Sequence, residues 1–264
     1  MPFTLDDEAL HELGRRAELA GLNASAPPQQ AQIDGWLIRL SPGKAKRSRC
    51  INALATGSLP LPDLLAQCRR AFDAAGLPLI LRITPFSQPA DLDDRLAAMG
   101  WQAFDAADVM VRASLDDLSS AQALPQGMRF EARPAADYAE IVGHLRGSTR
   151  REIDAHIERL QQSPVPYQGF VLMRGPTLLA CGQFAQEGDI VGLFDIFTPP
   201  EQRGQGRAGL LCIELLRAAS AQGARQAYLQ VGTDNAVAQR LYQRLGFVFS
   251  YRYHYRSDDP RAWD

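Results

Sequence analysis

One stretch near residue 200 constrains the fold of this chain more than any other, because it reads as strand, turn, loop and helix in succession. Phe194, Ile196 and Phe197 favour a strand. Pro199-Pro200 then ends that strand, since neither residue has an N–H for a ladder. A basic loop follows, and beyond it apolar residues recur at helical spacing. The stretch therefore predicts a strand that leads through a loop into an amphipathic helix.

The loop itself, Arg203-Gly204-Gln205-Gly206-Arg207-Ala208, has the composition of a phosphate site. Glycine lets the backbone approach a ligand closely, and the free N–H groups and dipole of a helix N-terminus favour an anion. No Lys-Ser/Thr follows the glycines, which argues against a nucleoside triphosphate loop. The glycines also follow a proline turn rather than a tight strand-to-helix turn, which argues against a dinucleotide fingerprint.

Two motifs at a fixed distance give this chain a resemblance to a known family. The loop resembles the R-x-x-G-x-G/A pyrophosphate loop of the GNAT superfamily, the acyl-CoA-dependent N-acyltransferases. Downstream, the chain is similar to that family's N-x-x-A-x-x-L-Y-x-x-x-G-F signature, at Asn235, Ala238, Leu241-Tyr242 and Gly246-Phe247. For residues from about 128 to 256 the resemblance implies the α+β fold of the family, a mixed twisted sheet flanked by helices.

The first half of the chain shows an echo of the second. Gly76, a strand at 79–83, a helix at 90–99 and Gly100-Trp101 repeat the order seen from Gly223 to Gly246-Phe247. We therefore expect two tandem GNAT-like domains, a degenerate one over residues 1–120 and a catalytic one over residues 127–264. The first lacks the phosphate loop, because Thr56-Gly57-Ser58-Leu59-Pro60 stands in its place.

Local patterns predict the remaining elements. The first half is expected to contain helices at 5–22 and 61–75, strands at 35–40, 50–55 and 108–112, a polar loop at 23–30 and a linker at 115–126. The second half is expected to contain strands at 128–133, 170–173, 178–184, 191–198, 227–231 and 247–255, with helices at 136–146 and 151–162 besides those of the two motifs.

The family resemblance also implies roles for individual residues. The amides of residues 203–208 would hold the diphosphate of acetyl-CoA, and the edge of Ile196-Phe197-Thr198 would pair with the pantetheine arm and the thioester carbonyl. Tyr242 would be the general acid for the departing thiolate, with a buried packing role as the alternative. Asn235 is expected to cap the following helix and to contact the cofactor arm.

The proton acceptor is less clearly marked. Gln230 stands where many relatives carry a glutamate, and an amide cannot accept a proton at neutral pH. Asp195 is the preferred candidate, with Glu187 and Asp189 behind it, although Asp195 could instead be a structural carboxylate at a strand bulge. The histidines are expected at surface or packing positions, and His254 alone merits a test.

Composition excludes several other classes of protein. Lys and Arg total 28 against 30 for Asp and Glu, a balance that argues against binding to nucleic acid or a membrane surface through bulk charge. No apolar run approaches the ~20 residues that span a bilayer. The four cysteines lack close spacing and have no histidine at ligand distance, so we expect no metal site and reduced thiols in a cytoplasmic protein.

The sequence thus favours an N-acyltransferase that moves an acetyl group from acetyl-CoA directly to a primary amine of a small molecule, amino acid or peptide. A non-catalytic acyl-CoA sensor is the alternative, and the N-terminal half could serve substrate recognition or form a homodimer. The basic loop at 44–49 is interpreted as a solvated connection, with contact to an outer phosphate or an acidic substrate as the alternative.

Overall fold

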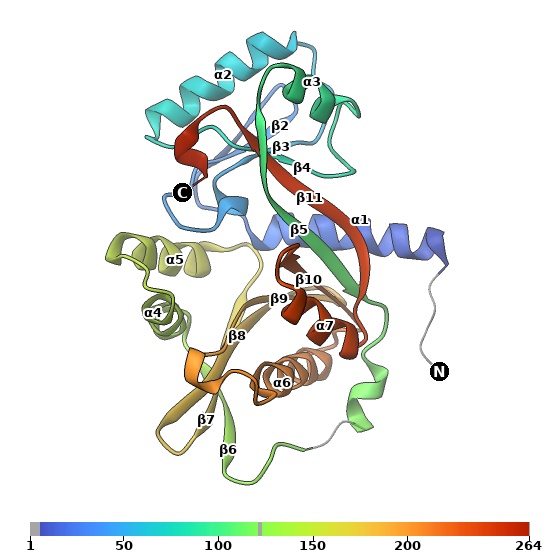
Figure 1. Cartoon of the computed structure of the whole chain (residues 1–264), viewed down its shortest axis with the longest axis vertical. Helices are drawn as coiled ribbons and strands as arrows, with labels where there is room; N and C mark the ends of the chain where they lie inside the picture. The colour runs from blue at the N-terminus through green and yellow to red at the C-terminus, as the bar shows by residue number, and fades with distance from the viewer. Residues whose placement is uncertain (1–5, 121–122, 264) are drawn as a thin grey trace.

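A computed structural model describes residues 6–120 and 123–263. The strands of this part of the chain form one mixed sheet of eleven, in the order β1-β2-β3-β4-β11-β5-β10-β9-β8-β7-β6 (Figure 1). The strands are β1 (Gln30–Ile33), β2 (Trp36–Arg39), β3 (Ile51–Ala53), β4 (Leu81–Ile83), β5 (Gln102–Arg112), β6 (Met128–Arg133), β7 (Tyr167–Arg174), β8 (Thr177–Glu187), β9 (Ile190–Phe197), β10 (Gln226–Gly232) and β11 (Val248–Ser257). The α-helices are α1 (Asp7–Ala24), α2 (Leu61–Ala74), α3 (Leu92–Ala98), α4 (Ala135–Leu145), α5 (Arg150–Gln162), α6 (Arg207–Ala221) and α7 (Ala236–Arg244).

The two halves of the chain interleave at the centre of the sheet. The last strand, β11, lies antiparallel between β4 and β5 of the first half, and β5 lies antiparallel between β11 and β10. Each half therefore completes the sheet of the other. The expected α+β fold with a mixed, helix-flanked sheet is confirmed. The degeneracy of the first half and a boundary near residues 120–127 stay predictions, because the sheet runs through both halves.

The segments that resemble each other in the two halves of the sequence occupy equivalent positions in this sheet. β4 and β10 flank the central β11-β5 pair on its two sides, and each is followed by a short helix, α3 or α7. Both helices end before a glycine with positive φ, Gly100 at 86° and Gly246 at 79°. Such angles favour glycine, which has no Cβ to clash.

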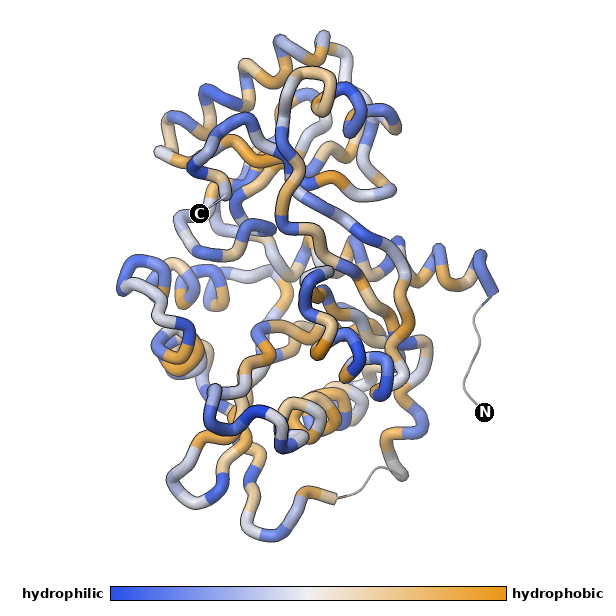
Figure 2. Tube along the Cα trace, viewed as in Figure 1, coloured by the Kyte–Doolittle hydropathy of each residue, from blue (hydrophilic) through white to orange (hydrophobic). Residues whose placement is uncertain are grey.

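Helices cover both faces of the C-terminal part of the sheet. Successive residues of a strand point to opposite faces, so Ala227 and Leu229 of β10 pack in the core beneath α6 and α7, whereas Tyr228 packs with α1. α4 and α5 cover the same side as α1, over β7 and β8. Figure 2 shows hydrophobic residues gathered along these strands and α6.

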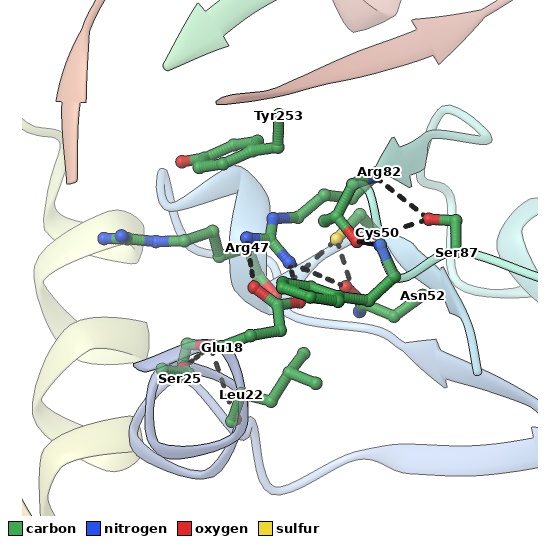
Figure 3. A network of polar contacts seen from close by, with 12 residues as sticks. Glu18, Leu22, Ser25, Arg47, Cys50, Asn52, Arg82, Ser87 and Tyr253 are labelled. Atoms are coloured by element: carbon green, nitrogen blue, oxygen red, sulfur yellow. Dashed lines mark hydrogen bonds and ion pairs between the residues drawn. The ribbon is translucent and has the colours of Figure 1, made fainter. Parts of the chain in front are cut away.

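α1 ties the two halves together. Asp6 caps its N-terminus by accepting a hydrogen bond from the Ala9 N–H at 2.8 Å. Its apolar side packs on β9, β5 and β11, and Figure 1 shows it crossing the middle of the molecule. From its inner side, Glu18 reaches the buried guanidinium of Arg82 on β4, with Nη1–Oε1 at 2.5 Å and Nη2–Oε2 at 2.9 Å (Figure 3).

The same ion pair reaches the last strand of the chain. The hydroxyl of Tyr251 on β11 donates to Glu18 Oε2 at 2.5 Å, and the Arg82 guanidinium carbon lies 4.0 Å from the ring centroid of Tyr253. Burial acts to raise the pKa of Glu18, but the charge and hydrogen bonds of Arg82 outweigh it and lower that pKa. One buried polar cluster thus joins α1, β4 and β11.

Two connecting segments differ in part from what was expected. The loop expected at 23–30 is present between α1 and β1, at residues 25–29. The strand that follows it, β1, was not expected; it is an exposed edge strand that pairs with β2 through the two-residue turn Asp34-Gly35, where φ is 46° and 83°. The linker expected at 115–126 begins as a packed segment, because Leu115 and Leu118 are buried against the α6 core. Residues 121–122 of that linker lie outside the described residues.

Candidate active site

The glycine-rich loop leaves a group of backbone donors unused at the start of α6. Gly204 and Gly206 both have φ of 73°, and Gly206 is the residue that precedes the helix. Among the hydrogen bonds of the described residues, none is donated by the N–H groups of residues 204–209. The loop is exposed, and Arg203 is fixed across it by a hydrogen bond from Nε to the Thr198 carbonyl at 3.1 Å. These N–H groups fit an anion such as a diphosphate.

The equivalent turn in the first half, before α2, is filled by the protein's own anion. The carboxylate of Asp34 accepts hydrogen bonds from the N–H groups of Ser58 and Leu59, each at 2.8 Å, and from Ser58 Oγ at 2.9 Å. These backbone hydrogen bonds lower the pKa of Asp34. Pro60, which precedes α2, has no N–H to offer. This turn therefore has its donors satisfied internally, whereas the turn before α6 does not.

β9 and β10 separate beside the glycine-rich loop. Their parallel pairing runs from Gln226 and Ile190 to Leu229 and Leu193 and then stops. β9 nevertheless continues to Phe197 and β10 to Gly232. The residues of β9 from 194 to 197, among them the predicted Ile196 and Phe197, therefore have no ladder partner on the β10 side. An extended ligand can pair with such an open strand edge.

Asp195 forms a bulge in β9 at this open edge. The pairing with β8 shifts register between Cys181 and Gln183, and Asp195 takes a φ of 51°. Its carboxylate accepts hydrogen bonds from Arg146 Nη1 and Gln183 Nε2, both at 2.6 Å. The carboxylate also lies 3.6 Å from His156 Nε2.

The partners of Asp195 determine its basicity. Burial acts to raise its pKa, but the charges of Arg146 and Arg159 and the hydrogen bond from Arg146 outweigh burial and hold the pKa well below the usual range. A carboxylate with so low a pKa is a weak proton acceptor. The geometry therefore fits the bulge role that the sequence left open better than the role of base.

Tyr242 and Asn235 lie on α7, which follows β10. Asn235 caps the helix as expected, by accepting a hydrogen bond from the Ala238 N–H at 3.1 Å. Tyr242 is 8% exposed and packs edge-to-face on Phe247, with ring centroids 6.1 Å apart. Burial, with the nearby Cys212 thiol, raises the pKa of Tyr242 well above its ordinary value, so the phenol stays protonated at neutral pH. The phenol is thus in the protonated form that a proton donor needs, while the raised pKa makes it a weaker acid than an exposed tyrosine.

A cavity of about 340 Å³ lies on the other side of the bulge, between α4, α5 and the basic loop at 41–48. Its ionisable lining residues are Lys44, Arg47, Arg146, Glu152, His156, Arg159 and Asp195. The spacing of residues 152, 156 and 159 places them on one face of α5. No local sequence signal marks this set, because a helix face becomes a cavity wall only when a distant loop covers it.

His156 and the basic loop differ from what the sequence indicated. His156 lines the cavity, and burial lowers its pKa to about 4, so the imidazole is neutral. The loop at 44–49 is not a solvated connection. Arg47 donates a hydrogen bond to Gln230 Oε1 on β10, and its guanidinium carbon lies 5.5 Å from the ring centroid of Phe194. Residues of the loop also line a second cavity, of about 700 Å³, at the end of β10.

Other candidate residues lie away from this site. Glu187 accepts hydrogen bonds from Asn23 Nδ2 at 2.9 and 3.1 Å, and Asp189 pairs with Arg16 at 2.5 Å, at the far end of β9. His254 contacts Asp93 in the first half. Over residues 6–120 and 123–263, no group of three metal-ligating side chains comes together, and no helix has the length and apolarity to cross a bilayer.

Comparisons with known proteins agree with this geometry. Residues 14–256 match the family described as "Probable histone acetyltransferase Rv0428c C-terminal". YobR of Bacillus subtilis (strain 168), an uncharacterized N-acetyltransferase, is 25% identical over 228 residues, which cover 86% of this chain and 91% of YobR.

Solved structures share the fold over nearly the whole chain. A GCN5-related N-acetyltransferase from Kribbella flavida superposes with a TM-score of 0.68 at 17% identity, covering 94% of this chain and 95% of the other. A tandem GNAT protein from the clavulanic acid biosynthesis pathway gives a TM-score of 0.61 at 15% identity, with 94% and 91% covered. The family match spans most of the residues, so this chain belongs to the Rv0428c C-terminal acetyltransferase family, within the GNAT superfamily.

Proposed function

We propose that this protein transfers an acetyl group from acetyl-CoA to a primary amine of a small molecule, amino acid or peptide. One observation carries the proposal. The loop from Arg203 to Ala208 presents its N–H groups, without protein partners among the described residues, beside the open edge of β9. Such donors suit the diphosphate of coenzyme A, and the open edge suits an extended pantetheine arm.

The reaction requires few protein groups. The neutral amine nitrogen attacks the thioester carbonyl carbon and releases one proton to solvent water as the amide forms, while the C–S bond breaks and the thiolate takes a proton from the protein. We assign that proton to Tyr242, whose phenol stays protonated at neutral pH and donates no hydrogen bond within the described part of the chain. Backbone N–H groups of residues 196–198 would stabilise the oxyanion, and Asn235 would contact the cofactor arm.

The structure's two halves would divide the work. We propose that the C-terminal half, from residue 127, holds the cofactor, and that the first half does not, because Asp34 already occupies its equivalent turn. The first half instead supplies one wall of the acceptor cavity through Arg47 and its loop. This assigns the N-terminal half to substrate recognition.

A regulatory acyl-CoA sensor remains the rival function, because Gln230 replaces the glutamate of many relatives and Asp195 is held in an ion pair. Release of free thiol from acetyl-CoA, measured with a library of amines, separates the two. An acetyltransferase releases thiol in step with acetylated amine. A sensor binds acetyl-CoA and releases none with any amine.

A further inference from the structure

The cavity beside the bulge contains a buried cation without a partner. Arg159 on α5 is 8% exposed and makes no hydrogen bond or ion pair with any described residue. Its guanidinium carbon lies 5.1 Å from the ring centroid of Tyr167, which supports it from one side. No nitrogen of Arg159 is among the fully buried, unpaired polar atoms of the described residues, so its donors open into the cavity that the residue lines. This arginine therefore offers unpaired donors to an anion that enters the cavity.

The hydrogen bonds of the two carboxylates in the cavity go to partners other than Arg159. Asp195 accepts hydrogen bonds from Arg146 and Gln183. Glu152 caps its own helix, accepting a hydrogen bond from the Thr149 N–H at 2.7 Å, and it lies 3.9 Å from Lys44. Asp195 interacts with Arg159 only through space, and neither carboxylate forms a direct ion pair or hydrogen bond with it.

The charge balance of the cavity also favours an anion. Four cationic side chains face two carboxylates, and the neutral His156 adds no charge. Arg47 has a single hydrogen bond from Nη1, to Gln230, so its remaining guanidinium donors are available. A volume of about 340 Å³ is at the small end of ligand pockets, which suits a metabolite-sized acceptor.

We propose that the acceptor of this enzyme carries an anionic group, a carboxylate or a phosphate, which Arg159 and Arg47 bind while its amine approaches the open edge of β9 at Asp195. The inference rests on the proposed acetyl transfer and names its substrate class. Arginine suits this role because its planar donors match carboxylate and phosphate oxygens in pairs.

Matched pairs of amines test the proposal. Each pair differs in one anion: an α-amino acid against its amide, and an aminoalkyl phosphate against the corresponding amino alcohol. Thiol release from acetyl-CoA gives kcat/KM for each. We expect the anionic member of at least one pair to be favoured by about 10- to 150-fold, the range for charge-assisted hydrogen bonds. The pair that shows the preference distinguishes carboxylate from phosphate.

Substitutions show which side chain binds the anion. Arg159→Gln should erase the preference, and Arg47→Gln should reduce it, while coenzyme A affinity stays at the wild-type value and reports a folded protein. Arg151→Gln is the matched control, because Arg151 is exposed on the same helix and does not line the cavity. Arg159→Lys, which keeps the charge but loses the paired donors, should give an intermediate ratio.

The outcomes separate this inference from the proposed function. Equal kcat/KM for both members of every pair, or a preference that persists in Arg159→Gln, overturns the anion site and leaves the acetyltransferase intact. If no amine releases thiol, the proposed function fails. The anion site is then tested by calorimetric titration of the protein with the members of the same pairs. Binding of the anionic member alone, lost in Arg159→Gln, supports it, and absent or equal binding overturns it.

Discussion

Replacing Gly206 with alanine probes the anion site at the start of α6 with little damage to the fold. Gly206 has a φ of 73°, where an L-residue costs roughly 1–2 kcal/mol. A Cβ at this position would meet no atom within 4 Å, so no steric term adds to that cost. The variant should therefore fold, with a modest loss of stability.

The effect on binding should be larger. A Cβ at residue 206 points into exposed space beside the free amides of residues 204–209, where the diphosphate would lie. Displacing the anion from one such donor loses a charge-assisted hydrogen bond, about 1.5–3 kcal/mol. We therefore expect coenzyme A affinity, measured by isothermal titration calorimetry, to fall about 10- to 150-fold, since ~1.4 kcal/mol is tenfold.

Gly175→Ala is the matched control for this substitution. Gly175 lies in the turn between β7 and β8, with a φ of 56° and no atom within 4 Å of a new Cβ. Both variants should lose similar stability in thermal unfolding, but only Gly206→Ala should weaken coenzyme A binding. Wild-type affinity in Gly206→Ala would refute the assignment of the loop.

Three further substitutions test other parts of the account. Tyr242→Phe should lower kcat ~10- to 1,000-fold with little change in coenzyme A affinity, as for loss of a general acid, and an unchanged kcat would leave Tyr242 as packing. Asp195→Asn keeps a residue that tolerates positive φ, and its pH–rate profile should retain the wild-type acidic limb; loss of that limb would make Asp195 the base. The folded state lowers the pKa of Asp195, so the Asp195 carboxylate stabilises the wild type above its unfolded pKa of ~3.9, and this contribution is lost as the pH falls. In urea unfolding, the stability of Asp195→Asn should lack this pH-dependent contribution. Arg82→Met leaves the buried Glu18 without its ion-pair partner and should cost about 3–5 kcal/mol at neutral pH. In the wild type, the Glu18 carboxylate stabilises the fold above its unfolded pKa of ~4.3. In Arg82→Met, the free energy of unfolding should instead rise as acid neutralises Glu18. If the variant showed the pH dependence of the wild type, the pairing of Glu18 with Arg82 would be contradicted.

Local sequence predicted the parts of the fold that local forces decide. The loop before α6 and the cap at Asn235 follow from residue types that favour those conformations wherever they occur. The hairpin of β1 and β2 also had a local signal, Asp34-Gly35, which the polar character of β1 concealed. Its strand lies at an exposed sheet edge, so no apolar alternation marks it.

Long-range arrangement could not be predicted in the same way. The insertion of β11 between β4 and β5 depends on pairing between strands more than a hundred residues apart, which periodicity does not encode. The cavity depends on the same arrangement. Arg159 looks like any helical arginine until the loop that carries Arg47 closes over it. The wall that we propose to bind an anion therefore emerges only from the fold.

The number of coenzyme A molecules bound per chain tests the central claim most directly. The turn before α6 has free donors, whereas Asp34 fills the equivalent turn before α2. Calorimetric titration of the intact protein should therefore give one equivalent of coenzyme A. Two equivalents, or none, would contradict the account.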